Sequence, residues 1–532
     1  MNESRLQQRL LYVAVFTGGM TTLAVEFAAS RLLGSIYGTS NIVWANIIGL
    51  ILIYLTIGYF VGGRWADRSP NYTTFYKLIA WAAFFSGLVP LIAHPILKGA
   101  AEAVQDLDAA VTVGSLVSVL VLFSVPVTLL GCISPFSIRL ALKDLDKAGG
   151  TTGRMYALST LGSIIGTFTP VLLLIPEVGT TRTFLIFAGA LLAVGLIGLS
   201  FQDRRAALRL LWMPVLLLIL AILALRGPLR PAPANTSLIY EKETAYNLVQ
   251  VVEDDEGYRF LLLNEGQGIH SQWHPDDLFY ERTWDYFLAG PYFNQPPYTP
   301  DRMQRIAIIG LAAGTIASQH NTVYPGLPMD GIEIDPGIVE AGREYMGMDM
   351  PNLNVIVEDG RFALNHLDFK YDMIGVDAYR VPYVPWHLTT VEFFTEVKDH
   401  LTDDGVLIIN VGRTPSDRRL IEAMTRTLLD VFPTVHTLDV AKSYNTILIA
   451  TRQPTTVDNF IANRDYLRAH EFSAGVTDLL LPVLDSVTPS MLVPTVASDT
   501  RFTDDRAPVE TIVDSMVVQF LLEGGINELS GD

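Results

Sequence analysis

The sequence has almost no cysteine. Its 532 residues include a single one, Cys132, which lies inside an apolar run. One thiol cannot form an internal disulfide or a cysteine-based metal cluster, so the usual structural zinc and iron–sulfur ligand sets are excluded. We therefore expect no metal cofactor.

Basic residues are scarce in the C-terminal part of the chain. Residues 1–230 carry 17 Lys and Arg against 10 Asp and Glu, whereas the remaining 302 residues carry 20 against 45. Binding to phosphate backbones needs clustered Lys and Arg, so this acidic part argues against a nucleic-acid partner. It is compatible with a cationic small molecule such as an amine, although acidity is also a common solubility feature.

Long apolar stretches, in contrast, are abundant before residue 230. There are seven, at about 10–30, 41–62, 78–97, 111–133, 156–176, 183–201 and 210–226. Each approaches the length that crosses a hydrocarbon layer of ~30 Å. We predict a polytopic helical domain over residues 1–226, in the cell membrane and with the lipid bilayer as its partner. The first stretch is not a signal peptide, because it lacks a cleavage-site pattern and six more follow it.

Polar groups within these stretches are candidate sites. Glu26 lies inside the first stretch, where a carboxylate is costly and indicates either a functional site or a pair with Arg31 near the interface. Gly162 and Gly166 form a small-xxx-small pattern, which predicts close helix packing.

A Pro-rich stretch marks the end of the helical domain. Residues 227–237 contain Pro228, Pro231 and Pro233 without hydrophobic periodicity, which predicts a stiff linker. Short alternating runs follow, with Glu253–Gly257 as a turn, and predict a small β subdomain over residues 238–285.

Residues 286–452 have the pattern of a nucleotide-binding α/β sheet. Buried-type strands are predicted at 305–309, 329–335, 354–358, 371–377 and 405–411, and a final pair at 435–438 and 446–450 completes seven strands in a Rossmann-like sheet. Residues 453–532 form a C-terminal extension.

Acids and glycines stand at the ends of successive strands. Gly310 and Gly314 follow the first strand and let the backbone approach a ligand without Cβ clashes. Glu333 has a carboxylate that can accept hydrogen bonds from the two hydroxyls of a ribose. Asp359 and Gly360 follow the third strand, where folds of this kind contact the adenine ring of a bound nucleotide. A strand-end acid can also be a helix N-cap, but three in series favour nucleotide binding.

Five elements in this order resemble one family. They are the glycine turn, Glu333-Ile-Asp335-Pro, Glu358-Asp359-Gly360-Arg361, Tyr371-Asp372 with Asp377, and Leu388-Thr-Thr390. Residues 236–452 resemble the spermidine synthase (polyamine aminopropyltransferase) family, which has the class I S-adenosylmethionine-dependent methyltransferase fold. With the preceding helices, the chain resembles bacterial membrane-fused members of that family.

The resemblance implies a reaction and its residues. Decarboxylated S-adenosylmethionine would be the donor, a di- or polyamine the acceptor, and Asp377 the catalytic carboxylate. Gln272 and Tyr280 would line the substrate pocket. Tyr379 and His387 would lie against the acceptor, with His387 as an alternative to Asp377 as the general base. A homodimer is a possible assembly.

Two departures from the family's pattern leave the substrate open. Arg380 stands where the family has a second aspartate, and Ala313 replaces an aspartate in the glycine turn. A protonated diamine facing Arg380 would be repelled, unless Glu281, Asp504 or Asp505 supplies the lost charge. The alternatives are methyl or alkyl transfer from S-adenosylmethionine to a membrane-delivered acceptor, and a non-catalytic transporter or sensor that binds polyamine or nucleotide.

Two arguments disagree about the side of the membrane on which the α/β domain lies. Most basic residues flanking the seven stretches fall on one side, whereas Arg31, Lys98 and Arg182 fall on the other. The positive-inside rule then places the N-terminus in the cytoplasm and, after seven spans, the α/β domain outside. Supply of an S-adenosyl donor favours a cytoplasmic domain, which would require a re-entrant or missed span.

Overall fold

The computed structural model describes residues 3–37, 41–103, 110–142, 145–226, 230–264, 268–379 and 384–522. The chain divides into two compact units. The first comprises residues 1–231 and 243–248, and the second comprises residues 232–242 and 249–532. The division after residue 231 falls within the stretch predicted as a linker.

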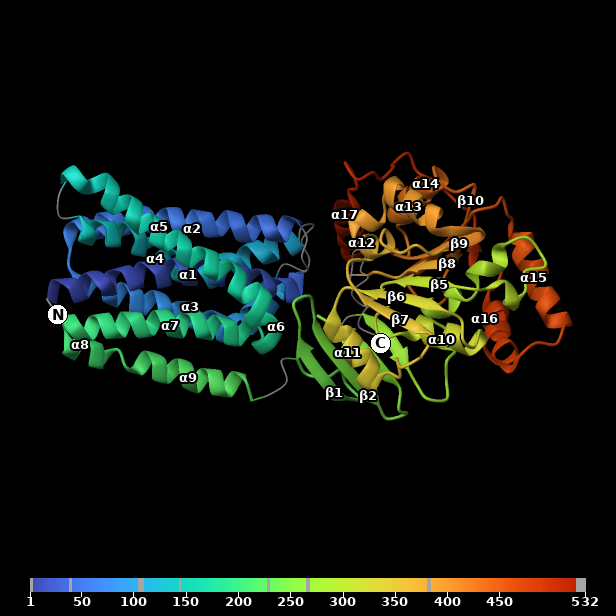
Figure 1. The fold of residues 1–532 in the computed structure, drawn as a ribbon, viewed down its shortest axis with the longest axis horizontal. Helices are drawn as coiled ribbons and strands as arrows, with labels where there is room; N and C mark the ends of the chain where they lie inside the picture. The colour runs from blue at the N-terminus through green and yellow to red at the C-terminus, as the bar shows by residue number, and fades with distance from the viewer. Residues whose placement is uncertain are drawn as a thin grey trace. The chain divides into compact units, whose positions relative to one another are not determined.

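The first unit is helical. Its helices are α1 (Glu3–Tyr37), α2 (Asn41–Arg68), α3 (Tyr72–Ala103), α4 (Ala110–Ala141), α5 (Ala148–Thr169), α6 (Ile175–Val178), α7 (Thr180–Gln202), α8 (Arg204–Arg209) and α9 (Trp212–Ala224) (Figure 1). A π-helix, Pro170–Leu174, joins α5 to α6. Among the described residues, seven helical segments are long and apolar enough to cross a membrane, and they coincide with the seven predicted stretches.

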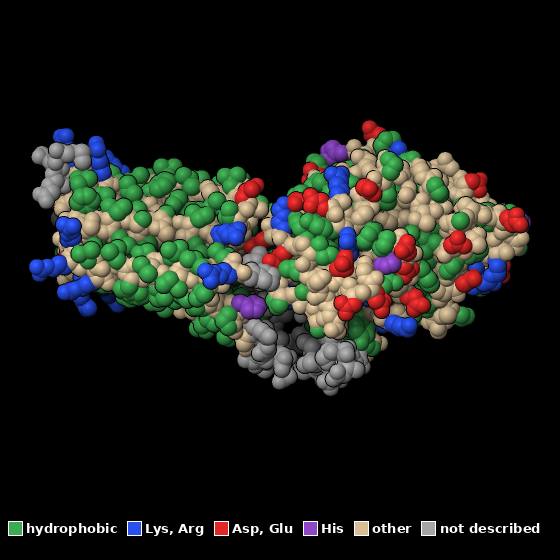
Figure 2. All heavy atoms as spheres, turned by 90° about the horizontal axis from the view of Figure 1, so that it is seen from below, with side chains coloured by type: hydrophobic (Ala, Val, Ile, Leu, Met, Phe, Trp, Pro, Cys, Tyr) green, Lys and Arg blue, Asp and Glu red, His purple; other side chains and the backbone are tan. Residues whose placement is uncertain are grey.

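Large apolar side chains are exposed on this unit. Phe60 of α2, Leu172 after α5 and Leu223 of α9 are each more than 60% exposed. Figure 2 shows hydrophobic side chains over most of the visible face of this unit, with Lys and Arg gathered near one end of the helices. An apolar surface of this extent is expected of a protein that contacts lipid or another apolar partner.

The predicted close packing at Gly162 and Gly166 is confirmed. A Cβ atom added to either residue would lie 2.0 Å from a backbone carbonyl of α1, that of Phe16 or Met20 respectively. Helix α5 therefore meets α1 backbone to backbone, which larger side chains would prevent.

Arg31 of α1 binds backbone rather than standing in open solvent. Its guanidinium donates hydrogen bonds to the carbonyl oxygens of Thr244 (2.7 Å) and Tyr246 (2.8 Å), both within the first unit. The predicted pairing of Arg31 with Glu26 stays a prediction.

The second unit begins with a four-stranded sheet in the order β1-β2-β3-β4. Its strands are β1 (Thr236–Glu243), β2 (Leu248–Asp254), β3 (Arg259–Leu263) and β4 (Ile269–Trp273). The sequence predicted the first three strands, and the fourth contains Gln272.

An eight-stranded sheet follows, in the order β12-β10-β11-β9-β8-β5-β6-β7. The strands are β5 (Ile306–Ile309), β6 (Met329–Glu333), β7 (Leu353–Val357), β8 (Tyr371–Val376), β9 (Leu401–Gly412), β10 (Thr434–Asp439), β11 (Asn445–Thr451) and β12 (Leu492–Val493). The prediction of seven strands was one short, because a two-residue strand of the C-terminal extension pairs with β10. So short a segment has no readable alternation.

Strand directions define a ligand-binding edge. The pairs β5–β6, β6–β7, β5–β8 and β8–β9 are parallel, whereas β11 is antiparallel to both β9 and β10. The chain leaves β5 toward β6 and β7, and then returns to the other side of β5 as β8. That reversal places a topological switch point at the carboxyl ends of β5 and β8, where open α/β sheets bind ligands.

Helices cover both faces of this sheet (Figure 1). They are α10 (Thr315–Val323), α11 (Pro336–Tyr345), α12 (Gly360–Leu364), α13 (Val391–His400), α14 (Arg419–Leu429), α15 (Val457–Ala469), α16 (Leu481–Ser486) and α17 (Val509–Leu522). Alternate strand residues face opposite layers. Ile306 and Ile308 pack with α10, α15 and α16, whereas Ala307 and Ile309 pack with α12, α13, α14 and α17.

Candidate active site

The switch point brings Gly310 against the residues that follow β8. Gly310 has φ of 84°, in the left-handed region that favours glycine. A Cβ atom added there would lie 2.5 Å from the amide nitrogen of Ala378 and 2.6 Å from the carbonyl carbon of Asp377. Any side chain at Gly310 would therefore displace the predicted catalytic residue.

Asp377 is held by a neutral donor from the neighbouring strand. The amide of Asn410, on β9, donates to Asp377 Oδ1 at 2.8 Å. Burial raises the pKa of Asp377 to about 7, and the interactions of the carboxyl with Asn410 and Trp284 oppose that rise. A carboxylate with a pKa near neutrality is suited to accept a proton at physiological pH.

Glu333 ties the end of β6 to the glycine turn. Its Oε2 accepts from the backbone amide of Ala312 and its Oε1 from that of Asp335, each at 3.0 Å. Burial raises the pKa of Glu333 to about 7 against these hydrogen bonds. Each carboxylate oxygen has two lone pairs, so the group can still accept from a ligand hydroxyl.

Strand β4 holds the glycine turn from the other side. Ser271 Oγ accepts from the amide of Ala313 at 3.0 Å. The Thr315 hydroxyl accepts from the amide of Gln272 and donates to its carbonyl, at 3.0 and 2.9 Å. Gly314, with φ of 89°, precedes α10 in this tight segment. Ala313, where the family has an aspartate, is buried and contributes its amide to this contact.

Two predicted substrate residues carry unsatisfied buried polar atoms. Gln272 Oε1 and the Tyr280 hydroxyl are buried and have no hydrogen-bond partner among the described residues. Buried polar groups are rarely left unpaired, so each of these two atoms is a candidate contact for a polar ligand. Nearby, Asp285 accepts from the amides of Tyr280 and Arg282, and burial raises its pKa to about 6.

Asp359 caps a helix and meets His387. Its Oδ1 accepts from the amides of Arg361 (3.1 Å) and Phe362 (3.0 Å), the N-cap role that the sequence left open. Its Oδ2 lies 3.0 Å from His387 Nε2. The absence of a side chain at Gly360 makes room for Ile309, because an added Cβ would lie 2.4 Å from Ile309 Cγ2. Their contact with an adenine stays a prediction.

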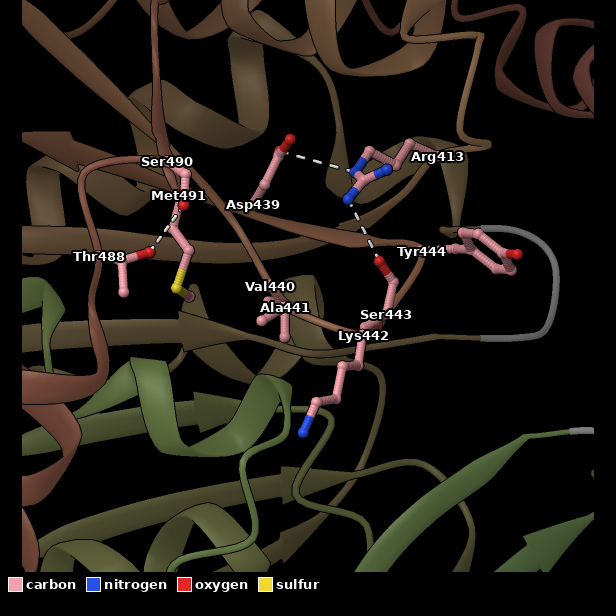
Figure 3. A pocket seen from close by; sticks show the side chains of 10 residues that line it. All are labelled: Arg413, Asp439, Val440, Ala441, Lys442, Ser443, Tyr444, Thr488, Ser490 and Met491. Atoms are coloured by element: carbon pink, nitrogen blue, oxygen red, sulfur yellow. Dashed lines mark hydrogen bonds and ion pairs between the residues drawn. The ribbon is translucent and has the colours of Figure 1, made fainter.

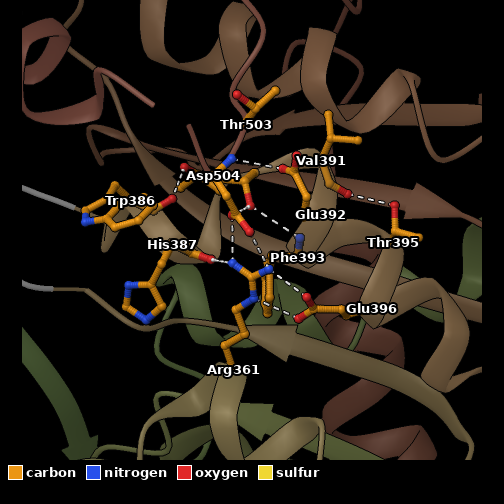
Figure 4. A network of polar contacts seen from close by, with 12 residues as sticks. Arg361, Trp386, His387, Val391, Glu392, Phe393, Thr395, Glu396, Thr503 and Asp504 are labelled. Atoms are coloured by element: carbon orange, nitrogen blue, oxygen red, sulfur yellow. Dashed lines mark hydrogen bonds and ion pairs between the residues drawn. The ribbon is translucent and has the colours of Figure 1, made fainter. Parts of the chain in front are cut away.

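Arg361 gathers carboxylates from distant segments. It binds Glu396 of α13 through two hydrogen bonds (2.8 and 2.6 Å) and Asp504 of the C-terminal extension through two more (2.8 and 2.9 Å). It also donates to the carbonyl of His387 at 3.3 Å. Figure 4 shows these side chains converging on the guanidinium. Asp504 is thus tied to Arg361, whose backbone amide donates to Asp359.

The remaining predicted acceptor residues differ in how far they can be placed. The Tyr379 hydroxyl hydrogen-bonds the backbone of Gly412 at the end of β9. Arg380 lies outside the described residues. Glu281, proposed as a replacement charge, pairs with Lys442 at 3.3 Å.

Sequence reasoning missed Asn410, Trp284 and Ser271. Asn410 could have been found, because an amide inside the apolar run Val406–Val411 is unusual unless it has a buried partner. Trp284 and Ser271 show no such pattern, because their partners are distant in sequence.

Comparisons with known proteins match the second unit. The Spermine/spermidine synthase domain matches residues 299–448. The probable polyamine aminopropyl transferase of Bifidobacterium longum is 33% identical over 220 residues, 41% of this chain and 47% of the relative. The polyamine aminopropyltransferase of Vibrio vulnificus is 30% identical over 228 residues, 41% of this chain and 72% of the relative. The chain belongs to the polyamine aminopropyltransferase family.

Solved structures of aminopropyltransferases are also similar to this family member. Spermidine synthase in complex with the transition state analogue AdoDATO is 17% identical, with 51% of this chain and 96% of that chain covered and a TM-score of 0.39. Spermidine synthase from Thermotoga maritima gives the same identity and coverage, with a TM-score of 0.38. The chain spans about half the length of the Bifidobacterium relative.

Proposed function

We propose that this chain is an aminopropyltransferase that moves an aminopropyl group from decarboxylated S-adenosylmethionine to an amine. The observation that carries the proposal is the placement of Asp377 at the switch point, against Gly310 and hydrogen-bonded by Asn410. The names of the relatives support aminopropyl transfer over methyl transfer and over a non-catalytic transporter or sensor.

The proposed step needs an uncharged amine. Its nitrogen lone pair attacks the carbon next to the sulfonium, a C–N bond forms, and the C–S bond breaks with its electron pair passing to sulfur. The sulfonium becomes the neutral thioether of methylthioadenosine. Asp377 accepts the proton that the amine loses, which its pKa of about 7 allows. Orientation of the two substrates supplies much of the remaining rate enhancement.

The donor would be held by the turn and the strand ends. The backbone around Gly310 and Gly314 can approach it closely, and Glu333 can accept from a ribose hydroxyl. Asp359 stands at the adenine end of the proposed site, with His387 beside it. The unpaired Gln272 Oε1 and Tyr280 hydroxyl are available to the substrates.

Product analysis tests this function. The full-length protein in detergent is incubated with decarboxylated or ordinary S-adenosylmethionine and a panel of amines, and the products are identified by mass spectrometry. Methylthioadenosine together with an amine heavier by one aminopropyl unit is the expected result. S-adenosylhomocysteine, or no product from either donor, contradicts the proposal.

We also propose that the helical unit anchors the enzyme in a membrane. Support comes from its seven apolar helical segments and from exposed residues such as Phe60 and Leu223. Partition of the chain into the detergent phase, and its resistance to carbonate extraction, tests the anchor.

The orientation of the enzyme can be decided by labelling. Donor supply favours a cytoplasmic α/β unit, whereas seven spans and the distribution of basic residues favour the opposite side. A Cys132→Ala chain with one cysteine introduced at exposed Glu256 would be labelled in intact cells by a membrane-impermeant maleimide only if the α/β unit is outside.

A further inference from the structure

A polar pocket lies at the hairpin that joins β10 to β11. Its volume is about 620 Å³, and its lining includes Arg413, Asp439, Lys442, Ser443, Thr488 and Ser490 (Figure 3). This volume is in the range of sites for small organic molecules. No role is assigned to it by the reaction described above.

Strand direction places this pocket at the catalytic edge of the sheet. Strand β9 is parallel to β8, and β10 runs in the same direction because β11 is antiparallel to both β9 and β10. Asp439 at the end of β10 and Arg413 after β9 therefore stand at the same edge as Asp377 after β8.

A line of hydrogen bonds joins the pocket wall to Asp377. Ser443 Oγ, which lines the pocket, donates to Asn445 Oδ1 at 2.8 Å. Asn445 Nδ2 donates to Asn410 Oδ1 at 2.8 Å, and Asn410 Nδ2 donates to Asp377 Oδ1 at 2.8 Å. Two amide side chains thus link the pocket wall to the carboxylate proposed as catalytic.

The acidic side chain of this lining is already neutralised. Asp439 accepts two hydrogen bonds from Arg418, at 2.7 and 3.0 Å, and one from the Thr446 hydroxyl at 2.7 Å. Arg413 Nε lies 3.6 Å from Asp439 Oδ1 as a second cation. Asp439 therefore has little attraction left for an ammonium group.

Positive charge remains in the pocket after this pairing. Arg413 and Arg418 share the single Asp439 carboxylate, so one positive charge is left over. Arg413 Nη2 donates to the Ser443 carbonyl at 3.2 Å, and the Arg413 side chain is 14% exposed (Figure 3). Lys442 adds a second cation, whose partner Glu281 is 64% exposed and weakly held. Among the described residues that line this pocket, an ammonium group would meet Arg413 and Lys442 and no unpaired carboxylate. Solvent screens the share of Lys442, whose side chain is 85% exposed, so Arg413 supplies most of the repulsion.

We propose that this pocket receives the far end of the acceptor and selects an acceptor whose far end is a carboxylate. The acceptor class is then an aliphatic amine with a terminal carboxylate, rather than a diamine. Arg413 and Lys442 bind the carboxylate, and the hydroxyls of Ser443, Thr488 and Ser490 complete its hydrogen bonds. This inference rests on the proposed aminopropyl transfer, whose acceptor it specifies.

A series of matched amines tests the selection. With decarboxylated S-adenosylmethionine and the full-length protein, kcat/KM is measured from methylthioadenosine release for 4-aminobutanoate, 4-amino-1-butanol, butylamine and 1,4-diaminobutane. We expect 4-aminobutanoate to exceed the diamine by about tenfold or more, the effect of a charge-assisted hydrogen bond in a partly buried site.

Variants assign the preference to the pocket. Arg413→Gln should lower the ratio of carboxylate to diamine by about tenfold, whereas Arg413→Lys, which keeps the charge, should retain most of it. Lys442→Glu should shift the ratio toward the diamine. Arg464→Gln is the matched control, because Arg464 pairs with Asp465 on α15 and does not line the pocket; its ratio should equal that of the unmodified chain.

The outcomes separate this inference from the proposed function. A preference for the diamine that Arg413→Gln leaves unchanged overturns the pocket assignment while aminopropyl transfer stands. Absence of methylthioadenosine with every amine overturns the proposed function. In that case 4-aminobutanoate binding is measured by saturation-transfer NMR, and equal binding by the unmodified chain and the Arg413→Gln variant overturns the pocket as well.

Discussion

Asn410 donates its side-chain amide to Oδ1 of Asp377, so the neighbouring strand β9 orients the carboxylate that follows β8. The amide cannot point the other way without cost, because Asn410 Oδ1 accepts from Asn445 Nδ2. In the proposed mechanism, Asn410 is a positioning residue that leaves Oδ2 of Asp377 to face the substrates.

Replacement of Asn410 by Leu should shift the pH dependence of transfer. The hydrogen bond from Asn410 lowers the pKa of Asp377, so its loss raises that pKa above about 7. The reactive carboxylate then forms at higher pH. We expect kcat/KM at pH 7 to fall about tenfold or more and to recover in part toward pH 9. A pH profile from pH 6 to pH 9 measures the shift.

The matched control for that change is Asn354→Leu. Asn354 donates to Asp330 at the same distance, 2.8 Å, from strand β7. Asn354, like Asn410, donates its side-chain amide to an aspartate, but it lies away from Asp377. The pH profile of the Asn354→Leu variant should therefore keep the midpoint of the unmodified chain. A parallel profile for Asn410→Leu, lowered without a shift, would mean that Asn410 serves the fold alone.

Asp377→Asn should abolish transfer and leave nucleotide binding in place. An amide has nearly the same shape but cannot accept the amine proton, and loss of such a base costs roughly 10²- to 10⁴-fold. Methylthioadenosine release and calorimetric binding of methylthioadenosine are measured together. Equal loss of binding and turnover would show that Asp377 holds the nucleotide instead.

Gly310→Ala should cost far more than Gly326→Ala. Both glycines have positive φ, 84° and 80°, so both variants suffer the same backbone strain of about 1 kcal/mol or more. An added Cβ at Gly310 meets the backbone of Asp377 and Ala378, whereas at Gly326 it meets nothing within 4 Å. Activity should therefore be lost in Gly310→Ala and kept in Gly326→Ala. Similar activities in the two variants would show that the close approach of Gly310 to the Asp377 backbone is not needed for transfer.

Glu333→Gln should flatten the pH dependence of stability. Burial raises the pKa of Glu333 from 4.5 to about 7 in the folded chain, so between these values the folded state holds a proton that the unfolded state has lost. Stability therefore falls as pH rises through this window, by about 3 kcal/mol at 1.36 kcal/mol per pH unit. Asp377 and Asp285 act in the same direction.

Thermal unfolding in detergent at pH 5 and pH 8 checks that prediction. The drop in Tm between the two pH values should be smaller for Glu333→Gln than for the unmodified chain, whatever the offset of the variant at pH 5. An unchanged drop would mean that the Glu333 carboxyl is not buried in the folded protein.

Arg361→Met should free the C-terminal segment around Asp504. Arg361 is 17% exposed and makes four hydrogen bonds to Glu396 and Asp504. Its removal leaves each carboxylate with one neutral donor, Asn365 or Thr390, and no cation, at a cost of about 2 kcal/mol. Limited trypsin digestion should then cut faster at Arg501 and Arg506. Arg464→Met is the control, and an equal cutting rate in both variants would contradict this role of Arg361.

Local patterns predicted most of the fold. The seven apolar helices, and the order of strands and glycine turns in the sheet, could be predicted because each depends on a sequence pattern within a few residues. Strand β12 was missed because its two residues carry no period, and its pairing with β10 is a long-range event. Gly162 and Gly166 predicted a close helix contact, but only the structure shows that the partner of α5 is α1.

The site was predicted less completely than the fold. The strand-end residues Gly310, Glu333 and Asp377 follow from topology, because parallel strands bring their carboxyl ends together. The partners of these residues do not, since Asn410, Trp284 and Ser271 act through side chains whose directions depend on tertiary packing. Asp359 shows the limit, because a helix cap and a ligand contact give the same sequence pattern.

The hydrogen bonds of β4 to the glycine turn tie two sides of the proposed site together. Rotation of the four-stranded sheet against the turn would break the contacts of both Ser271 and Gln272. The contact between His387 and Asp359 is a single bridge between side chains about one-third exposed. In the proposed reaction we therefore expect methylthioadenosine to leave on the His387 side, where only this bridge has to open.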